Sequence, residues 1–330
     1  MSLGDAAGRD ARGGVWTRYW ATGMPHSCAR SYGDTYGGAL GAHWRDLFAS
    51  LRSGDRLLDV ATGNGALPRL VLDSQPKGGM SVDAIDLALI APAWLAAAPA
   101  EQAARVRFHG GVPAESLPFS AGDFSLVVSQ YGIEYSEMDR SVPEVLRVLA
   151  PGGRVRIVAH HRDARPVLLA GDEIGHIDWL VTPGCLLELA HAMCEPMARA
   201  ATAAGRESLA TDMHANALRG RFNEAQQAAA RRIEGSRCPD VLHDVREWIA
   251  QAFAVAGSRG TEPARRALEQ ARRLLADSRV RLDELRRCAL DDAGADTLCA
   301  RLSAGGASVR HAVLRDGEHV LGWAVAADAS

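Results

Sequence analysis

The chain has 330 residues, of which 47% are hydrophobic and 23% charged, and this composition predicts a globular protein with a large core. Its formal net charge of −3 gives no attraction for polyanions, so we expect no nucleic acid partner. Six scattered cysteines without a Cys-x-x-Cys pair argue against a disulfide-stapled secreted fold, and we expect reduced thiols and a cytoplasmic location.

The N-terminal segments lack the features of a targeting or membrane sequence. Residues 1–14 are polar and glycine-rich without the apolar region of a signal peptide, and we expect a disordered tail. The sequence has no run of about 18 apolar residues, so no membrane span is expected. Residues 15–52 are rich in aromatic residues and glycine, and they end in a helical pattern. We interpret them as a cap that closes over a site as a lid, and the equal alternative is that Trp16, Tyr19 and Trp20 pack against a sheet.

Residues 53–165 alternate short apolar runs with helical segments. Strands are expected at Arg56–Ala61, Met80–Asp86, Val106–Gly110, Asp123–Ser129 and Arg154–Ala159. Helices are expected at Ala66–Ser74, Pro92–Ala104 and Ser141–Leu149. Strands that alternate with helices predict βαβ units, and therefore an α/β fold whose mostly parallel sheet has helices on both faces.

The last two segments complete this fold. Residues 305–330 hold strand-like runs at Val309–Leu314 and Val320–Ala326 around an Asp-Gly turn, which predicts a β-hairpin. The hairpin would bring a Rossmann-like sheet to seven strands. Residues 166–304 have helical periodicity, and we interpret them as an insertion that covers the substrate site and is not an independent domain. Their Met and Cys residues are more typical of a core or a dimer interface, so a homodimer is also considered.

The strongest chemical signal is the segment LLDVATGNG at residues 57–65. Glycine lets backbone N–H groups approach a ligand closely at the start of a helix. Asp86 ends the second strand, where a carboxylate accepts hydrogen bonds from ribose hydroxyls in dinucleotide-binding folds. Each feature alone is equally well explained by a tight turn or a surface acid, but together they favour a nucleotide-like ligand.

Four segments resemble the class I S-adenosylmethionine-dependent methyltransferases: LLDVATGNG, AIDLA, VPAESLPFSAGDFSLVVS and EVLRVLAPGGRVRIV. The resemblance runs from about Leu57 to His161. Nicotinamide enzymes share the glycine turn but not the last two segments. The resemblance therefore implies S-adenosylmethionine as cofactor and methyl transfer to a small-molecule acceptor.

The resemblance also implies which residues hold the cofactor. Asp59 would reach the amino group of the methionine moiety, Asp86 the ribose hydroxyls, and Leu87 would pack on the adenine. The implied cofactor residues are Asp59, Ala61, Thr62, Gly63, Gly65, Asp86 and Leu87, with Ala114 and Glu115 beside the adenine and Gln130 near the methionine end. Two residues depart from the family pattern. Ala61 stands where glycine is usual and demands a permissive backbone angle, and Pro113 stands where an acid is frequent.

Candidate catalytic residues follow the fourth and fifth strands. His160 or His161 is a candidate general base because imidazole titrates near neutral pH, although a strand can simply end in polar residues. Glu134 is a candidate base or amine-binding carboxylate, with a surface acid as the alternative. The expected substrate and lid residues are Tyr19, Trp20, His26, Tyr32, Tyr36, Tyr131 and Tyr135. We expect no metal site, because adjacent histidines on a strand face apart.

Two other functions stay open. A sealed site could let the cofactor cyclise on its own carbon chain and release methylthioadenosine. Alternatively, the chain could be a non-catalytic partner subunit that binds the cofactor, which predicts a large exposed apolar face on the helical insertion.

Overall fold

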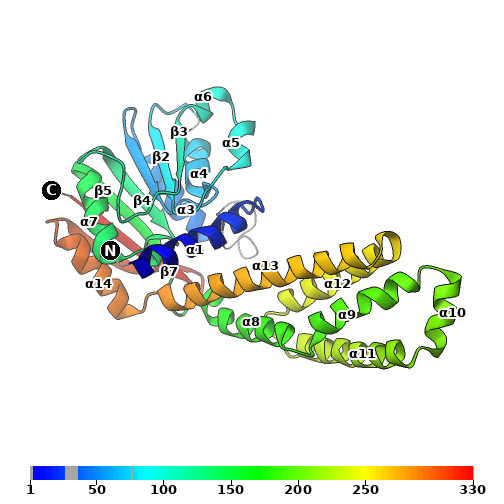
Figure 1. Cartoon of the computed structure of the whole chain (residues 1–330). Helices are drawn as coiled ribbons and strands as arrows, with labels where there is room; N and C mark the ends of the chain where they lie inside the picture. Colours follow the sequence, from blue (N-terminus) through cyan, green and yellow to red (C-terminus); the bar gives the residue numbers. More distant parts are fainter. Residues whose placement is uncertain (1–2, 27–35, 76, 330) are drawn as a thin grey trace. The chain divides into compact units, whose positions relative to one another are not determined.

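The computed structural model describes residues 3–26, 36–75 and 77–329 (Figure 1). It divides into two compact units. The sheet unit comprises Met1–Leu168 and Glu284–Ser330, and the helical unit comprises Leu169–Asp283. Within the described ranges, no helix has both the length and the apolar character that crossing a bilayer requires.

The sheet unit is built on a seven-stranded sheet of order β3-β2-β1-β4-β5-β7-β6. The strands are β1 (Arg56–Val60), β2 (Ser81–Asp86), β3 (Val106–Gly110), β4 (Phe124–Gln130), β5 (Leu149–Ala159), β6 (Ser308–Asp316) and β7 (His319–Asp328). The first five strands pair in parallel, whereas β7 is antiparallel to both β5 and β6. This topology confirms the expected Rossmann-like, mostly parallel sheet with a C-terminal hairpin.

Helices cover both faces of the sheet because successive residues of a buried strand point to opposite sides. On β1, Leu57 packs in a cluster with α3 and α4, and the next residue, Leu58, packs in a cluster with α7 and α14. These helices are α3 (Gly38–Ala49), α4 (Ala66–Ser74), α7 (Met138–Val148) and α14 (Asp292–Ser303). Burial on both faces explains why the strands read as continuous apolar runs.

One expected helix is divided. Instead of a single helix over Pro92–Ala104, the chain forms α5 (Ala93–Ala97) and α6 (Ala100–Ala103). Ala98 between them is extended, with φ −74° and ψ 152°. The break follows from Pro99, because the proline ring disfavours helical angles at the residue before it.

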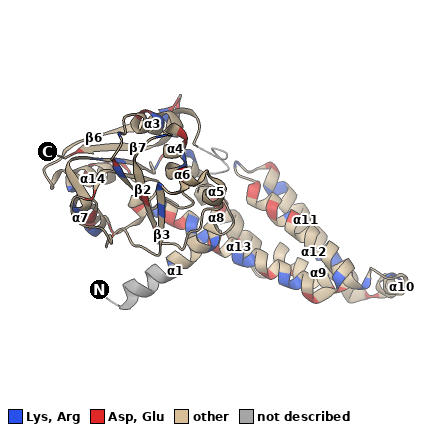
Figure 2. Ribbon diagram, turned by 90° about the horizontal axis from the view of Figure 1, so that it is seen from above, with Lys and Arg blue, Asp and Glu red and all other residues tan. Residues whose placement is uncertain are grey.

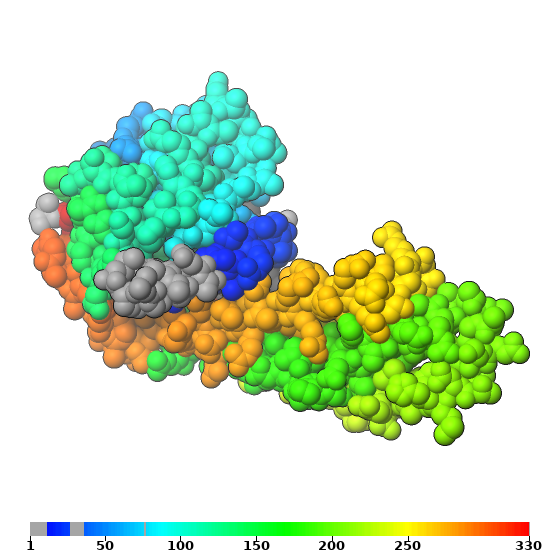
Figure 3. All heavy atoms as spheres, viewed as in Figure 1, coloured from blue at the N-terminus to red at the C-terminus, as the bar shows by residue number. Residues whose placement is uncertain are grey.

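The N-terminal segment corrects a second expectation. A disordered tail was expected over 1–14, but α1 is a single helix over Leu3–Trp20. Its C-terminal half is fixed by tertiary contacts: the Arg12 guanidinium donates to the Tyr135 carbonyl at 2.9 Å, and the Leu89 amide donates to Thr17 Oγ1 at 2.9 Å. Figure 3 shows the described part of α1 as dark blue atoms against the cyan atoms of the segment that follows β2. The polar, glycine-rich composition predicted disorder because it reflects local helix propensity alone, whereas α1 is stabilised by these tertiary contacts.

The helical unit, Leu169–Asp283, is shorter than the insertion that was expected over 166–304. Its helices are α8 (Arg165–Val181), α9 (Leu186–Arg199), α10 (Ala203–Thr211), α11 (Met213–Glu234), α12 (Asp240–Arg259) and α13 (Thr261–Cys288), where α8 and α13 continue into the sheet unit. Leu187, Phe222 and Ile249 belong to a core of this unit's own, and Figure 2 shows acidic and basic residues interspersed along α11, α12 and α13. In contrast, α14 belongs to the sheet unit, because Leu298 and Leu302 pack in the same core as α7.

The assignment of α14 to the sheet unit can be tested. Leu298 is fully buried, so Leu298→Ala should lower the free energy of unfolding by about 2–5 kcal/mol through lost contacts and a cavity. Met213 is 86% exposed, and Met213→Ala should change stability by no more than about 0.5 kcal/mol. Hydrogen exchange under mild denaturant should show lost protection in α7 and β6 of Leu298→Ala. Loss confined to residues 169–283 would assign α14 to the helical unit.

Candidate active site

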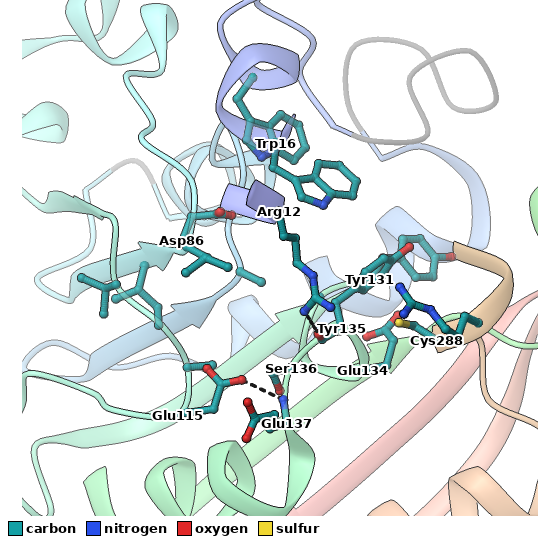
Figure 4. A pocket seen from close by; sticks show the side chains of 18 residues that line it. Arg12, Trp16, Asp86, Glu115, Tyr131, Glu134, Tyr135, Ser136, Glu137 and Cys288 are labelled. Atoms are coloured by element: carbon teal, nitrogen blue, oxygen red, sulfur yellow. Dashed lines mark hydrogen bonds between the residues drawn. The ribbon is translucent and has the colours of Figure 1, made fainter. Parts of the chain in front are cut away.

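A pocket of about 480 Å³ lies in the sheet unit where β1, β2 and β4 end (Figure 4). The carboxyl ends of parallel strands are where ligands bind in open α/β sheets. Its wall is formed by Arg12, Trp16, Trp20, Ala61, Ile85, Asp86, Leu87, Val112, Ala114, Glu115, Tyr131, Gly132, Glu134, Tyr135, Ser136, Glu137, Arg287 and Cys288. The structure thus brings together residues from six separate parts of the sequence.

The Asp86 carboxylate connects the end of β2 to the glycine turn. Its Oδ2 accepts a hydrogen bond from the Gly63 amide at 2.8 Å, and its Oδ1 accepts one from the Ala88 amide at 2.8 Å. Asp86 is 8% exposed, and this burial raises its pKa to about 6 although both amides favour the charged form. The group therefore titrates within a range that is accessible to experiment.

Asp59 lies behind the pocket wall. It is buried, and its Oδ2 accepts a hydrogen bond from the Thr62 hydroxyl at 2.5 Å. Burial raises the pKa of Asp59 to about 8, the Thr62 hydroxyl opposes this shift, and the charge of Asp86 adds to it. The carboxyl is therefore mostly protonated at pH 7. Neither Gly63 nor Gly65 lines the pocket, whereas Ala61 of the same turn does.

Ala61, which stands where the family usually has glycine, adopts a backbone angle that glycine tolerates more easily. Its φ is +59°, in the left-handed region that costs a non-glycine residue roughly 1–2 kcal/mol. Space for its methyl group comes from Gly132, where an added Cβ would lie 2.5 Å from the Ala61 Cβ. The glycine missing at position 61 is thus matched by one at position 132, after β4.

The C-terminal half of α1 covers the glycine turn. An added Cβ on Gly63 would lie 2.6 Å from the Trp20 ring, so Trp20 rests on the turn. The Asn64 side chain donates to the carbonyls of Trp20, at 2.9 Å, and Met24, at 2.7 Å. Trp16 lines the pocket and meets the Tyr135 ring edge-on at 6.0 Å. In this structure the segment both packs on the sheet unit and walls the pocket.

Glu284, at the C-terminal end of α13, anchors the same helix. It is 4% exposed, and its carboxylate lies 2.6 Å from the Arg12 guanidinium. The Trp16 indole N–H also donates to it at 3.0 Å. Two residues of α1 are therefore fixed by one buried acid.

Of the other expected aromatic residues, those that the structure describes do not line the pocket. The Tyr19 hydroxyl donates to the His26 carbonyl at 3.3 Å, and the His26 ring lies 4.5 Å from the Tyr36 ring. Tyr32 lies outside the described residues. Gln130 is buried and accepts a hydrogen bond from the Trp44 indole, so its side chain is directed to α3 instead of the pocket wall.

The structure separates the two candidate histidines. The backbone N–H and Nδ1 of His160 both lie 2.8 Å from Glu134 Oε1, and its ring stacks on Tyr131 at 4.2 Å. His161 stacks instead on Trp323 at 4.6 Å, and its Nδ1 accepts from the Asp163 amide at 3.0 Å. Only His160 therefore contacts a residue of the pocket wall.

Sequence reasoning missed several wall residues. Arg12 was assigned to a tail, and Arg287 and Cys288 lie about 150 residues beyond Glu134 in a helix with no local motif. Gly132 follows β4 closely, and the alanine at position 61 is the one signal that could have pointed to it. Burial raises the pKa of the Cys288 thiol to about 11, so this thiol stays protonated near neutral pH.

Several known proteins are similar to part of this chain. Residues 57–153 match the protein family described as a methyltransferase domain. Demethylmenaquinone methyltransferase of Thermus thermophilus is 36% identical over 107 residues, which covers 31% of this chain and 46% of that protein. An uncharacterised protein of Mycobacterium tuberculosis is 34% identical over 140 residues, which covers 37% of this chain and 48% of that protein.

A further relative has a solved structure. The uncharacterised methyltransferase YcgJ of Bacillus subtilis is 32% identical over 143 residues, covering 42% of this chain and 53% of that protein. Its crystal structure aligns with a TM-score of 0.31 at 27% identity, over 42% of this chain and 58% of that chain. The chain spans about half the length of the curated relatives it matches.

The Ala61–Gly132 contact predicts a coupled pair of mutations. Gly132→Ala should destabilise the wild-type protein, because the new Cβ would lie 2.5 Å from the Ala61 Cβ. Ala61→Gly should raise the free energy of unfolding by roughly 0.5–1 kcal/mol, because glycine adopts the left-handed angle without steric cost. In that background Gly132→Ala should cost about 0.5–3 kcal/mol less. Denaturant unfolding of all four proteins measures the coupling, and simple additivity would contradict it.

Proposed function

The chain contains a methyltransferase domain of the S-adenosylmethionine-dependent family, as its motifs predicted, and from this premise we propose that the protein binds S-adenosylmethionine in the pocket and methylates a small molecule. The observation that carries the proposal is the buried Asp86 carboxylate in the pocket wall, fixed by the Gly63 amide. A carboxylate held in this position can accept hydrogen bonds from the two hydroxyls of a ribose.

The residues around Asp86 fit a nucleoside. Leu87, Val112 and Ala114 supply apolar wall beside the carboxylate, and Glu115 follows them. An apolar slot next to an acid suits a heterocyclic base joined to a sugar with free hydroxyls. The pocket volume of about 480 Å³ also falls in the range of roughly 300–1,000 Å³ that is typical of small-ligand sites.

The cofactor, when bound, supplies a methyl group on a positively charged sulfur. The protein's own part is to hold the reacting groups in line, to exclude water and to favour the positive charge. Trp16 and Trp20 line the pocket from α1, and the carboxylates of Asp86 and Glu134 make its wall acidic. The pocket volume of about 480 Å³ supports a small acceptor, because the acceptor must share this pocket with the cofactor.

Binding at Asp86 predicts a pH-dependent affinity. Asp86→Asn should weaken S-adenosylmethionine binding at pH 7.5 by about tenfold or more, because a charge-assisted hydrogen bond contributes roughly 1.5–3 kcal/mol. Since the pKa of Asp86 is about 6, wild-type affinity should fall as pH decreases from 7.5 to 5, whereas the variant should stay flat. Isothermal titration calorimetry measures both, with Asp73→Asn on an exposed turn of α4 as the control.

Folding stability should change in the opposite direction over part of the same range. The folded state raises the pKa of Asp86 from 3.8 to about 6, so it holds this proton more tightly than the unfolded chain. The contribution of Asp86 to stability is therefore lost as pH rises from about 4 to 6 and should be absent in Asp86→Asn.

A pH-independent wild-type affinity would show that Asp86 does not contact the cofactor.

The reaction itself is tested by product analysis. The purified protein with S-adenosylmethionine alone should form no methylthioadenosine above the enzyme-free rate. In the presence of an acceptor it should form S-adenosylhomocysteine and methylated acceptor in equal amounts. Mass spectrometry of all small products measures both outcomes. Methylthioadenosine formed by the protein alone would contradict methyl transfer and favour cyclisation of the cofactor.

A further inference from the structure

Glu134 carries a buried oxygen atom that no hydrogen bond from the described part of the chain satisfies. The residue lies in the short 3-10 helix η1 (Ile133–Tyr135), lines the pocket and is 4% exposed. Its Oε1 is 2.8 Å from both the backbone N and the Nδ1 of His160, whereas its Oε2 has no hydrogen-bond partner among the described residues. A buried carboxylate oxygen without a partner is costly, so this atom indicates a ligand group that completes it.

The surroundings keep this carboxylate in one orientation. His160 contacts the carboxylate twice and stacks on Tyr131, whose hydroxyl donates to the Leu321 carbonyl at 2.9 Å. Tyr131 has a φ of +52°, an unfavourable angle for a bulky residue. Strain of this kind is typical of functional sites, where surrounding contacts hold a residue in place. The chain thus holds Oε2 at a fixed point of the pocket wall.

The pocket around this atom favours a positive charge. Its wall carries the carboxylates of Asp86, Glu115, Glu134 and Glu137 but the guanidinium groups of only Arg12 and Arg287. The Arg12 guanidinium is itself paired with buried Glu284 at 2.6 Å. The rings of Trp16, Trp20, Tyr131 and Tyr135 also line the pocket, and aromatic faces attract cations. An acidic, aromatic wall selects cations over anions.

Figure 4 shows Glu134 beside Cys288 and Tyr131, on a different side of the pocket from Asp86. Asp86 and the apolar residues that follow it suit the nucleoside of the cofactor, which leaves the side at Glu134 for the second reactant. We propose that Glu134 Oε2 binds the cationic nitrogen of the acceptor, so that the acceptor class is a protonated amine. Transfer of one N–H proton to Oε2 leaves the nitrogen with the lone pair that a methyl acceptor needs. This inference rests on the proposed function and extends it to a substrate class.

The first test compares matched ligands on the wild-type protein. We would measure the affinities of 2-phenylethylamine and 2-phenylethanol by calorimetry for the full chain saturated with S-adenosylhomocysteine. Cyclohexylmethylamine and cyclohexylmethanol form a second pair. Each amine should bind at least about tenfold more tightly than its alcohol, because a hydrogen bond to a charged group contributes roughly 1.5–3 kcal/mol. Equal affinities within each pair would overturn the proposal without any variant being needed.

The second test assigns the selectivity to Oε2. Glu134→Gln can keep an oxygen facing His160 while replacing Oε2 with an N–H donor, so amine affinity should fall at least tenfold and alcohol affinity should not. Glu137→Gln removes one carboxylate from the same wall and should change amine affinity by less than about threefold. Equal losses in both variants would mean that overall charge, and not Glu134, selects the amine. Thermal unfolding monitors whether either variant is destabilised.

The third test distinguishes the acceptor from the cofactor, which also carries a positive charge on sulfur. Glu134→Gln should leave unchanged the ratio of affinities for S-adenosylmethionine and its uncharged product S-adenosylhomocysteine. Selective loss of S-adenosylmethionine affinity would mean that Glu134 faces the sulfonium, and the proposal would be wrong. Failure of the wild type to bind either compound would overturn the proposed function, whereas amine selectivity measured without them would still test Glu134.

Discussion

The hydrogen bond from the Gly63 amide to the Asp86 carboxylate ties together the ends of two neighbouring strands. It can form because β1 and β2 pair in parallel with Val60 opposite Ile85, so that both strands end at the same edge of the sheet. The Thr62 amide also donates to the Ile85 carbonyl at 2.9 Å, so the glycine turn is joined to β2 at two points. Helix α1 packs on this turn through Asn64 and Trp20, so the turn connects the end of β2 to the helix that lines the pocket.

The two most buried carboxylates of the pocket wall, Asp86 and Glu134, lie in different hydrogen-bonding environments. Both oxygens of Asp86 are occupied by backbone amides, which favour the charged form and offset part of the effect of burial. Within residues 3–26, 36–75 and 77–329, Glu134 accepts hydrogen bonds through one oxygen only, from His160. Two carboxylates in one pocket can therefore bind different ligand groups, because different hydrogen-bond donors surround each of them.

The strands themselves, the hairpin and the position of Asp86 at the end of the second strand could be predicted, because apolar runs and turn residues are local signals. The family pattern also pointed to the unusual backbone at Ala61. Other features depend on contacts between distant residues, which leave no local trace. Glu284 fixes α1 from more than 260 residues away in the sequence, and helical periodicity continues without change from α13 into α14 although these helices serve different cores. The roles expected for individual site residues remain predictions.

The Ala61–Gly132 pair restricts the order of changes by which an ancestor with glycine at position 61 could have reached this sequence. A methyl group at position 61 fits only when position 132 carries no Cβ, because the two atoms would otherwise lie 2.5 Å apart. An intermediate with glycine at both positions avoids the overlap. Glycine at position 132 therefore has to be present when alanine enters at 61, and position 132 can regain a side chain without overlap only after 61 returns to glycine. The two positions, 71 residues apart in the sequence, can therefore change only in a restricted order.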